Sequence, residues 1–175
     1  MSNFYEVKIM TKKLLTGQVA KKYTTASYKE TQKLGKKLAK KILLQKQNKI
    51  ATVLGLYGDL GGGKTTFLQG FAKGLKIKDK ILSPTFVIFK KFQIPPIVKS
   101  TLPRVFCDGY FYHIDCYRIN KPEEILELGF KKIISDPKNI VAVEWPEKIK
   151  KYLPKNTIKI EFKFIDKNKR EIVVR

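Results

Sequence analysis

The sequence predicts an α/β domain in three layers, built on a mixed, mostly parallel sheet with a C-terminal β-hairpin. A near-continuous apolar run at residues 50–57 is typical of a strand that is buried on both faces of a sheet. Segments with helical periodicity alternate with strand-like segments, which favours helices on both sides of that sheet. Alternating stretches at 157–165 and 170–174 flank a polar turn and predict the hairpin.

Two amphipathic helices are expected in the first half of the chain, one before and one after the apolar run. In residues 28–44, apolar side chains recur at helical spacing between lysines. The second helix is expected to begin at about Lys64. The apolar stripe of the first helix consists of Leu34, Leu38, Ala39 and Ile42, and that of the second of Leu68, Phe71, Ala72 and Leu75.

The second half of the chain predicts further strands and one short helix. The strand candidates are residues 85–94, 109–115 and 139–145. Three prolines lie between the first two of these segments, so a surface loop is expected there. Asn120 is expected to cap a short helix that carries Pro122 in its first turn and ends before Gly129.

The length and composition predict one domain with a single core. The chain has 175 residues, so residues 27–175 are expected to form one domain after a basic N-terminal extension at 1–26. The longest apolar stretch is too short to cross a bilayer and residues 1–13 do not resemble a signal peptide, so a cytoplasmic protein with no membrane segment is expected. Cys107 and Cys116 have neither metal-ligand nor redox spacing, which argues against a structural metal.

The chain is strongly basic, with 37 Lys and Arg against 15 Asp and Glu and a formal net charge of +22. One interpretation is a polyanionic partner such as nucleic acid. The other is a lysine-rich composition of the kind that an A/T-rich genome produces, since 33 of the 37 basic residues are Lys and phosphate clamps favour Arg. The charge alone therefore leaves contact with RNA open.

The strongest functional signal directly follows the first buried strand. Residues 58–65 fit the P-loop pattern G-x-x-x-x-G-K-[ST] and lead into the second helix, which makes the expected fold P-loop NTPase-like. Glycines let the backbone N–H groups turn inward around phosphates, and the helix adds the positive end of its dipole. Lys64 is expected to reach the β- and γ-phosphates, and the Thr65 hydroxyl to bind Mg²⁺. The expected nucleotide-binding positions of this segment are Leu60, Gly61, Gly62, Gly63, Lys64, Thr65 and Thr66.

Two carboxylates end predicted strands beside this loop. Glu144 closes a buried strand and is expected to bind the metal, with an ordinary acid at the edge of a strand as the alternative. Asp115 ends an alternating strand and is a candidate to orient the attacking water or a metal-bound water. Its alternative role is to cap a turn or to pair with Arg118. The loop at 83–86 places hydroxyl groups where a switch that senses the γ-phosphate would lie.

Taken together, five motifs resemble the TsaE (formerly YjeE) family of small bacterial P-loop ATPases. The motifs are Gly58-Asp59-Leu60-Gly61-Gly62-Gly63-Lys64-Thr65-Thr66, Ser83-Pro84-Thr85-Phe86, His113-Ile114-Asp115-Cys116-Tyr117-Arg118, Pro122-Glu123-Glu124 and Glu144-Trp145-Pro146-Glu147. The resemblance runs from about residue 27 to 174. Gly62 stands where the family usually has alanine, and Cys116 where it usually has leucine.

The resemblance implies an ATPase that supports formation of threonylcarbamoyladenosine in tRNA together with the TsaD and TsaB subunits, with any contact to tRNA made through that complex. It implies ATP and Mg²⁺ as cofactors, with Mg²⁺ on Thr65 and Glu144. Asp115 would then serve hydrolysis with Lys64, and Thr85 would be the switch. Arg170, on the closing hairpin, would lie near the nucleotide. Trp145 would lie near the site, or else be a core aromatic.

The residues also bear on three other functions. A small GTPase is disfavoured, because the segments that begin at Asn120 and Asn168 carry Glu where the guanine-reading Asn-Lys-x-Asp motif needs Asp. A small-molecule kinase usually surrounds the transferred phosphoryl group with arginines, and this chain has four in total. A basic tRNA-binding module that uses nucleotide only as a switch differs from an ATPase in showing no multiple turnover.

Overall fold

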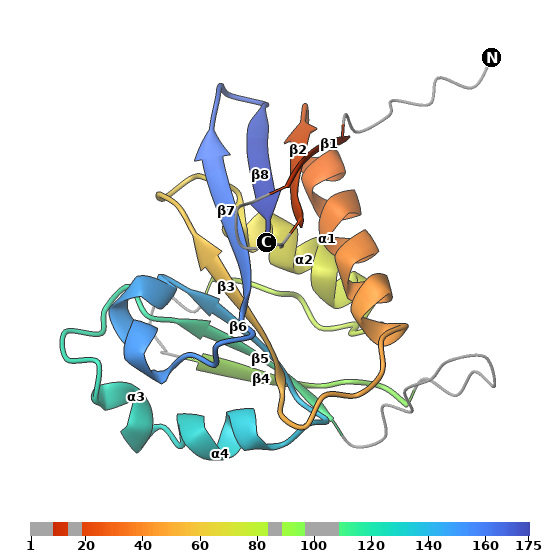
Figure 1. Cartoon of the computed structure of the whole chain (residues 1–175). Coiled ribbons are helices and arrows are strands. Elements are labelled where there is room, and N and C mark those ends of the chain that lie inside the picture. Colours follow the sequence, from red (N-terminus) through yellow and green to blue (C-terminus); the bar gives the residue numbers. More distant parts are fainter. Residues whose placement is uncertain (1–8, 14–18, 84–88, 97–108) are drawn as a thin grey trace.

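The computed structural model describes residues 9–13, 19–83, 89–96 and 109–175. Within these residues the strands form one eight-stranded sheet in the order β1-β2-β8-β7-β3-β6-β5-β4. Helices cover both faces of the sheet, which gives the three layers seen in Figure 1. The predicted α/β architecture is therefore confirmed.

The centre of the sheet is parallel. β3 lies between β6 and β7, and β5 lies on the other side of β6. The pairs β3–β6, β3–β7 and β5–β6 are all parallel. The four strands are β3 (Thr52–Tyr57), β5 (Tyr110–Asp115), β6 (Ile140–Glu144) and β7 (Ile158–Phe164). β3 and β6 are almost completely buried, as expected for strands with helices on both faces.

Antiparallel strands complete both margins of the sheet. These strands are β1 (Ile9–Lys13), β2 (Val19–Thr25), β4 (Phe89–Gln93) and β8 (Arg170–Val174). β7 and β8 form the predicted hairpin, whose turn is closed by Asp166 through hydrogen bonds from the backbone N–H groups of Asn168 and Lys169. The structure differs from the expected boundary at residue 27, because β2 pairs with β8 and so belongs to the sheet.

The two helices that the sequence predicted both cover one face of the sheet. They are α1 (Tyr28–Leu43) and α2 (Lys64–Gly74). Their contact is close because glycines replace side chains between them: a Cβ at Gly70 would lie 1.9 Å from the Gln32 carbonyl oxygen, and one at Gly35 would lie 2.2 Å from that of Phe67. This packing fixes the position of α2, whose first turn carries the P-loop lysine.

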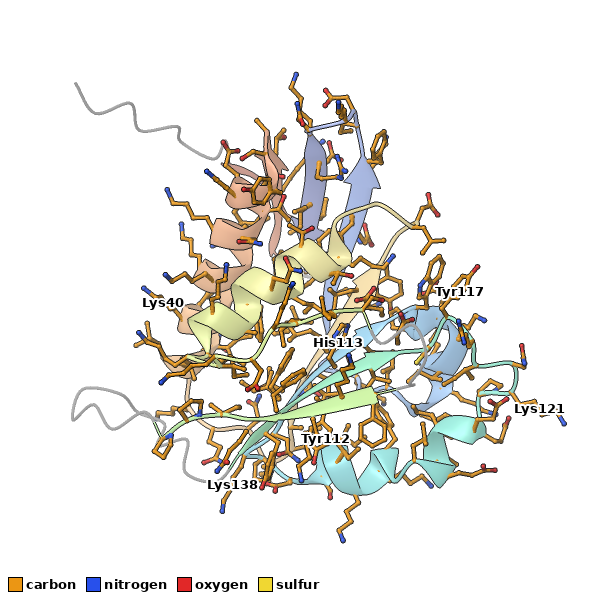
Figure 2. All side chains as sticks on the ribbon, turned by 180° about the vertical axis from the view of Figure 1, so that it is seen from behind. Lys40, Tyr112, His113, Tyr117, Lys121 and Lys138 are labelled. Carbon is orange, nitrogen blue, oxygen red and sulfur yellow. The ribbon has the colours of Figure 1, made fainter. Side chains whose placement is uncertain are left out.

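The other face is covered by shorter elements, namely α3 (Glu124–Glu127), α4 (Phe130–Ser135) and the 3₁₀ segment η1 (Pro146–Tyr152). Strand alternation divides the core between the two faces. Figure 2 shows this on β5, where His113 lies towards α2 and Tyr112 lies towards α3 and α4. The same view shows Lys40 on the outer side of α1.

The expectation that Asn120 caps a helix was wrong. α3 begins only at Glu124, whose carboxylate accepts a hydrogen bond from the backbone N–H of Lys121 at 2.7 Å, so Glu124 and not Asn120 satisfies a donor before the helix. Gly129 does end α3, in a left-handed conformation with φ of 72°. It also starts α4, which sequence reasoning missed, as it did η1.

Two expectations fall partly or wholly outside the described residues. The strand predicted at 85–94 is seen as β4 from Phe89, and residues 85–88 lie outside the described part of the chain. Most of the proline-containing connection, residues 97–108, does so as well. No helix within the described ranges combines the length and the hydropathy that a membrane span requires.

Candidate functional site

The P-loop joins the carboxyl end of β3 to the first turn of α2. Three of its glycines, Gly58, Gly61 and Gly63, have φ of 120°, 73° and 98°, values that residues with a side chain rarely adopt. Gly58 is also packed tightly, since a Cβ there would lie 2.2 Å from the Phe162 carbonyl oxygen in β7. The backbone path therefore favours glycine at all three positions, and the neighbouring strand also requires it at Gly58.

Lys64 is buried at the start of α2, with 4% of its surface exposed. Its Nζ donates hydrogen bonds to the carbonyl oxygens of Gly58 and of Asp59, the latter at 2.9 Å, and lies 4.5 Å from the centre of the Trp145 ring. Burial lowers the pKa of Lys64, while the nearby carboxylates of Glu144 and Asp115 oppose that shift. A desolvated ammonium group held by carbonyl oxygens is well suited to meet an anionic phosphate.

Thr65 and Glu144 form the part of the site that could hold a divalent cation. Thr65 Oγ1 lies 3.5 Å from Glu144 Oε1, and Glu144, at the end of β6, is 3% exposed. A hydroxyl and a carboxylate supply the hard oxygen ligands that Mg²⁺ prefers. No cluster of three or more His, Cys, Asp or Glu side chains that could hold a metal occurs in the described ranges. The residues fit Mg²⁺ that is shared between a few protein oxygens, phosphate and water.

His113 contacts the same carboxylate. Its Nε2 lies 2.8 Å from Glu144 Oε1, and both side chains are buried. Sequence reasoning quoted His113 only as part of a motif and did not predict this contact. The contact depends on the register of β5 and β6, which pairs His113 with Ala142 and Asp115 with Glu144.

Asp115 lies at the end of β5, next to Glu144 in the sheet. Its Oδ2 accepts a hydrogen bond from Ser83 Oγ at 3.3 Å, and its Oδ1 accepts one from the backbone N–H of Tyr117 at 3.0 Å. The second bond caps the turn after β5. Asp115 thus has a structural contact and also faces the pocket beside Glu144.

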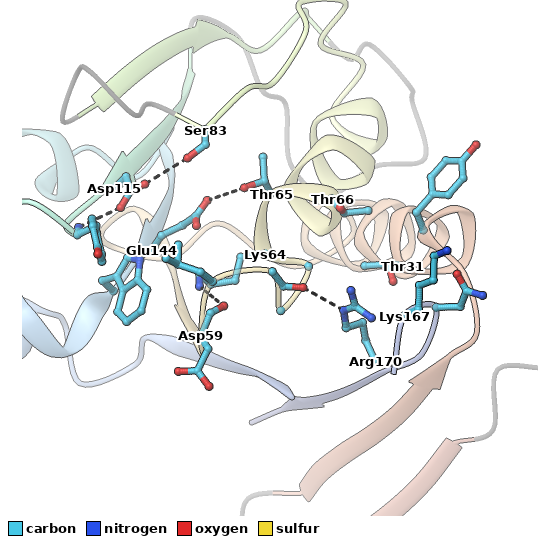
Figure 3. Close-up of a pocket in the computed structure, with 18 of the residues that line it drawn as sticks. Thr31, Asp59, Lys64, Thr65, Thr66, Ser83, Asp115, Glu144, Lys167 and Arg170 are labelled. Carbon is cyan, nitrogen blue, oxygen red and sulfur yellow. Dashed lines mark hydrogen bonds between the residues drawn. The ribbon is translucent and has the colours of Figure 1, made fainter. Parts of the chain in front are cut away.

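Arg170 approaches the P-loop from the opposite side, as Figure 3 shows. Its Nε donates a hydrogen bond to the Gly61 carbonyl oxygen at 3.2 Å. Its Nη1 donates to the carbonyl oxygens of Asp166 and Lys169 in the β7–β8 turn. The hairpin therefore holds a guanidinium group against a segment that is 109 residues away in sequence.

These side chains surround one pocket of about 580 Å³. Among the residues predicted from sequence it is lined by Leu60, Gly61, Gly62, Gly63, Lys64, Thr65, Thr66, Asp115, Glu144 and Arg170. Trp145 also lines the pocket, with its ring centroid 5.3 Å from that of Tyr117. Thr85, the expected switch, lies outside the described residues.

Sequence reasoning missed four further lining residues, Tyr28 and Thr31 from α1 and Lys167 and Asn168 from the β7–β8 turn. Nothing in the spacing of Tyr28 or Thr31 distinguishes them from other helical positions. Lys167 and Asn168 could have been found from Arg170, because a hairpin that brings Arg170 to the P-loop brings its own turn as well.

Comparison with known proteins shows the family to which this chain is similar. Residues 25–172 match the family described as "Threonylcarbamoyl adenosine biosynthesis protein TsaE". The chain is 36% identical to the tRNA threonylcarbamoyladenosine biosynthesis protein TsaE of Rickettsia typhi over 85% of this chain and 90% of that protein. It is 38% identical to the Bacillus subtilis TsaE over 69% of this chain and 66% of that protein.

The fold comparison agrees. The crystal structure of Bacillus subtilis YdiB superposes with a TM-score of 0.66 and 28% sequence identity, covering 94% of this chain and 86% of that one. The P-loop, the three-layer fold and the sequence matches therefore point the same way. This chain belongs to the TsaE family of threonylcarbamoyladenosine biosynthesis proteins.

Proposed function

We propose that this chain binds ATP with Mg²⁺ in the P-loop pocket and hydrolyses it to ADP and phosphate. The observation that carries the proposal is the buried Lys64 ammonium at the start of α2, inside a glycine-rich loop and opposite the Thr65–Glu144 pair. This arrangement offers positive charge and backbone N–H groups to phosphates on one side, and oxygen ligands for a cation on the other. The family assignment supports the proposal.

Each residue then has a defined task. The backbone of residues 60–66 holds the phosphates, and Lys64 moves its hydrogen bonds from the loop carbonyls to phosphate oxygens. Thr65 and Glu144 hold Mg²⁺, which when bound offsets negative charge on the β- and γ-phosphate oxygens. Asp115 orients the attacking water. Arg170 braces the loop at Gly61, and Thr85 reports the presence of the γ-phosphate.

The family assignment also supports a place in tRNA modification. The relatives are named for threonylcarbamoyladenosine biosynthesis. We propose that ATP hydrolysis by this chain supports that pathway in a complex with TsaD and TsaB, and that the chain reaches tRNA through this complex. Turnover by the isolated chain is then slow, and the partners raise it.

The test compares wild type with Lys64→Ala in ATP binding and in phosphate release, with and without TsaD, TsaB and tRNA. Lys64→Ala removes charge-assisted hydrogen bonds to the phosphates, which contribute about 1.5–3 kcal/mol. We therefore expect its affinity for ATP to be about 10- to 100-fold weaker, with the fold retained. Lys36→Ala, at an exposed α1 position, is the matched control and should behave as wild type. Normal ATP turnover by Lys64→Ala would contradict the assignment of the pocket.

A further inference from the structure

His113 is the least expected side chain around this pocket. It lies in the middle of β5, on the face that packs towards α2, and its side chain is fully buried. The neighbouring position on the same face of that strand, Phe111, packs against Phe71 of α2 as an ordinary core residue. A polar ring therefore occupies a place that the fold could fill with an apolar side chain.

The ring makes one polar contact and leaves one nitrogen unpaired. Nε2 lies 2.8 Å from Glu144 Oε1, while Nδ1 is buried and has no hydrogen-bond partner among the described residues. An ionised carboxylate only accepts hydrogen bonds, so Nε2 carries the proton and donates. The bare Nδ1 is then an unsatisfied acceptor in the core, which costs free energy that an apolar residue would avoid. The unpaired nitrogen is thus a cost, and what the histidine provides in return is its hydrogen bond to Glu144.

The contact does explain how the Glu144 carboxylate is held in place. Oε1 receives both the His113 Nε2–H and the Thr65 hydroxyl, at 2.8 and 3.5 Å. Oε2 receives no hydrogen bond from the described residues. Glu144 also lines the pocket, so its carboxylate is within reach of a ligand there. Oε1 is thus held by hydrogen bonds within the protein, while Oε2 has no such partner among the described residues.

We propose that His113 is a positioning residue for Glu144. By donating to Oε1, it fixes the orientation of the carboxylate that would bind the Mg²⁺ accompanying the nucleotide. This inference rests on the proposed function, since it assigns a second layer of contacts to the same cation site. Partners of this kind orient metal ligands, and their removal typically costs 10- to 100-fold in metal affinity or activity.

The experiment titrates Mg²⁺ into protein that is saturated with a non-hydrolysable ATP analogue and records the Mg²⁺ concentration at half effect. His113→Leu removes the donor and should raise that concentration about 10- to 100-fold. Analogue affinity in EDTA should stay within about twofold, because His113 does not line the pocket and, among the described residues, makes no hydrogen bond to the P-loop. Urea unfolding should show a lower stability than wild type, because the buried Glu144 carboxylate loses its donor, so the Mg²⁺ midpoint is the deciding measurement.

Two further variants separate positioning from packing. In His113→Gln, the side-chain Nε2 lies as many bonds from Cβ as the histidine Nε2 and can still donate, so the wild-type Mg²⁺ midpoint should return to within about threefold. His113→Asn is too short to reach and should resemble His113→Leu; the Gln and Asn pair carries the test if the leucine variant does not fold. Phe111→Leu, on the same strand face, should lower stability and leave the Mg²⁺ midpoint unchanged.

The outcomes separate this inference from the proposed function. A wild-type chain that bound the analogue equally well with and without Mg²⁺ would overturn both. A normal Mg²⁺ response in wild type, unchanged in His113→Leu or in His113→Asn, would overturn the role of His113 alone. An equal shift in Phe111→Leu would also overturn it, because general loosening of the core would then account for the effect.

Discussion

Replacement of Asp115 separates its structural contact from its proposed part in hydrolysis. In Asp115→Asn, the remaining carbonyl oxygen can accept from the Tyr117 backbone N–H, and the new amide can donate to Ser83 Oγ. Both contacts seen in the structure survive, so we expect the free energy of unfolding to change by less than about 1 kcal/mol. The variant removes the negative charge and little else.

The effect on hydrolysis should be much larger. A group that orients or accepts a proton from the attacking water contributes about 100- to 10,000-fold, or about 2.7–5.5 kcal/mol in the activation barrier. Nucleotide affinity should be unchanged or tighter, because a carboxylate no longer faces the phosphates. Asp115→Ala loses both hydrogen bonds as well, and we expect it to cost a further 1–3 kcal/mol, roughly, in stability.

The assay is single-turnover release of phosphate in the presence of Mg²⁺, TsaD and TsaB, measured beside nucleotide affinity and urea unfolding. Single turnover isolates the chemical step from product release. A fall of tenfold or less in Asp115→Asn, together with a loss of stability in Asp115→Ala, would refute the hydrolytic role. Asp115 would then be the residue that caps the turn after β5 and nothing more.

Two further predictions test the fold around the site. Gly70→Ala places a methyl group on the Gln32 carbonyl oxygen, so urea unfolding should show a loss of about 1–3 kcal/mol despite the better helix propensity of alanine; a gain in stability would contradict the close packing of α1 on α2. Burial raises the pKa of the Cys116 thiol from 9.0 to about 12, so the unfolded chain ionises first as the pH rises above 9. Between pH 8 and pH 10, wild type should lose about 1.4 kcal/mol of its free energy of unfolding that Cys116→Ala does not lose. Urea unfolding at the two pH values measures this, and an equal loss in wild type and Cys116→Ala would count against the raised pKa.

The parts of the site that are contiguous in sequence could be predicted without the structure. Residues 58–65 lie between an apolar strand and an amphipathic helix, and the glycine spacing, Lys64 and Thr65 all act through the local backbone. Glu144 and Asp115 were found because each ends a strand, and parallel strands present their carboxyl ends at the same edge of a sheet. These signals depend on local geometry and on one general rule of α/β folds.

Other features depended on strand order and register, which a single sequence does not specify. β2 was expected to belong to a basic extension, because two consecutive lysines interrupt its apolar residues and it shows no alternation, yet it pairs with β8 towards one margin of the sheet. Tyr28 and Thr31 line the pocket only because α1 packs on α2 through glycines. Asn120 was misassigned as a helix cap because the helix begins only at Glu124, four residues later, and the Glu124 carboxylate accepts the backbone N–H of Lys121.

The sequence by itself thus determined the P-loop pattern, the hydroxyl and the carboxylate that we propose for a cation, and the family to which these motifs belong. The tertiary structure alone decided how the carboxylate is held. His113 and Glu144 are 31 residues apart, and they meet because parallel pairing of β5 with β6 sets them diagonally on one buried face. A contact of this kind requires the register of the two strands, and its burial places it in a low-dielectric core, where a hydrogen bond is electrostatically stronger than in water.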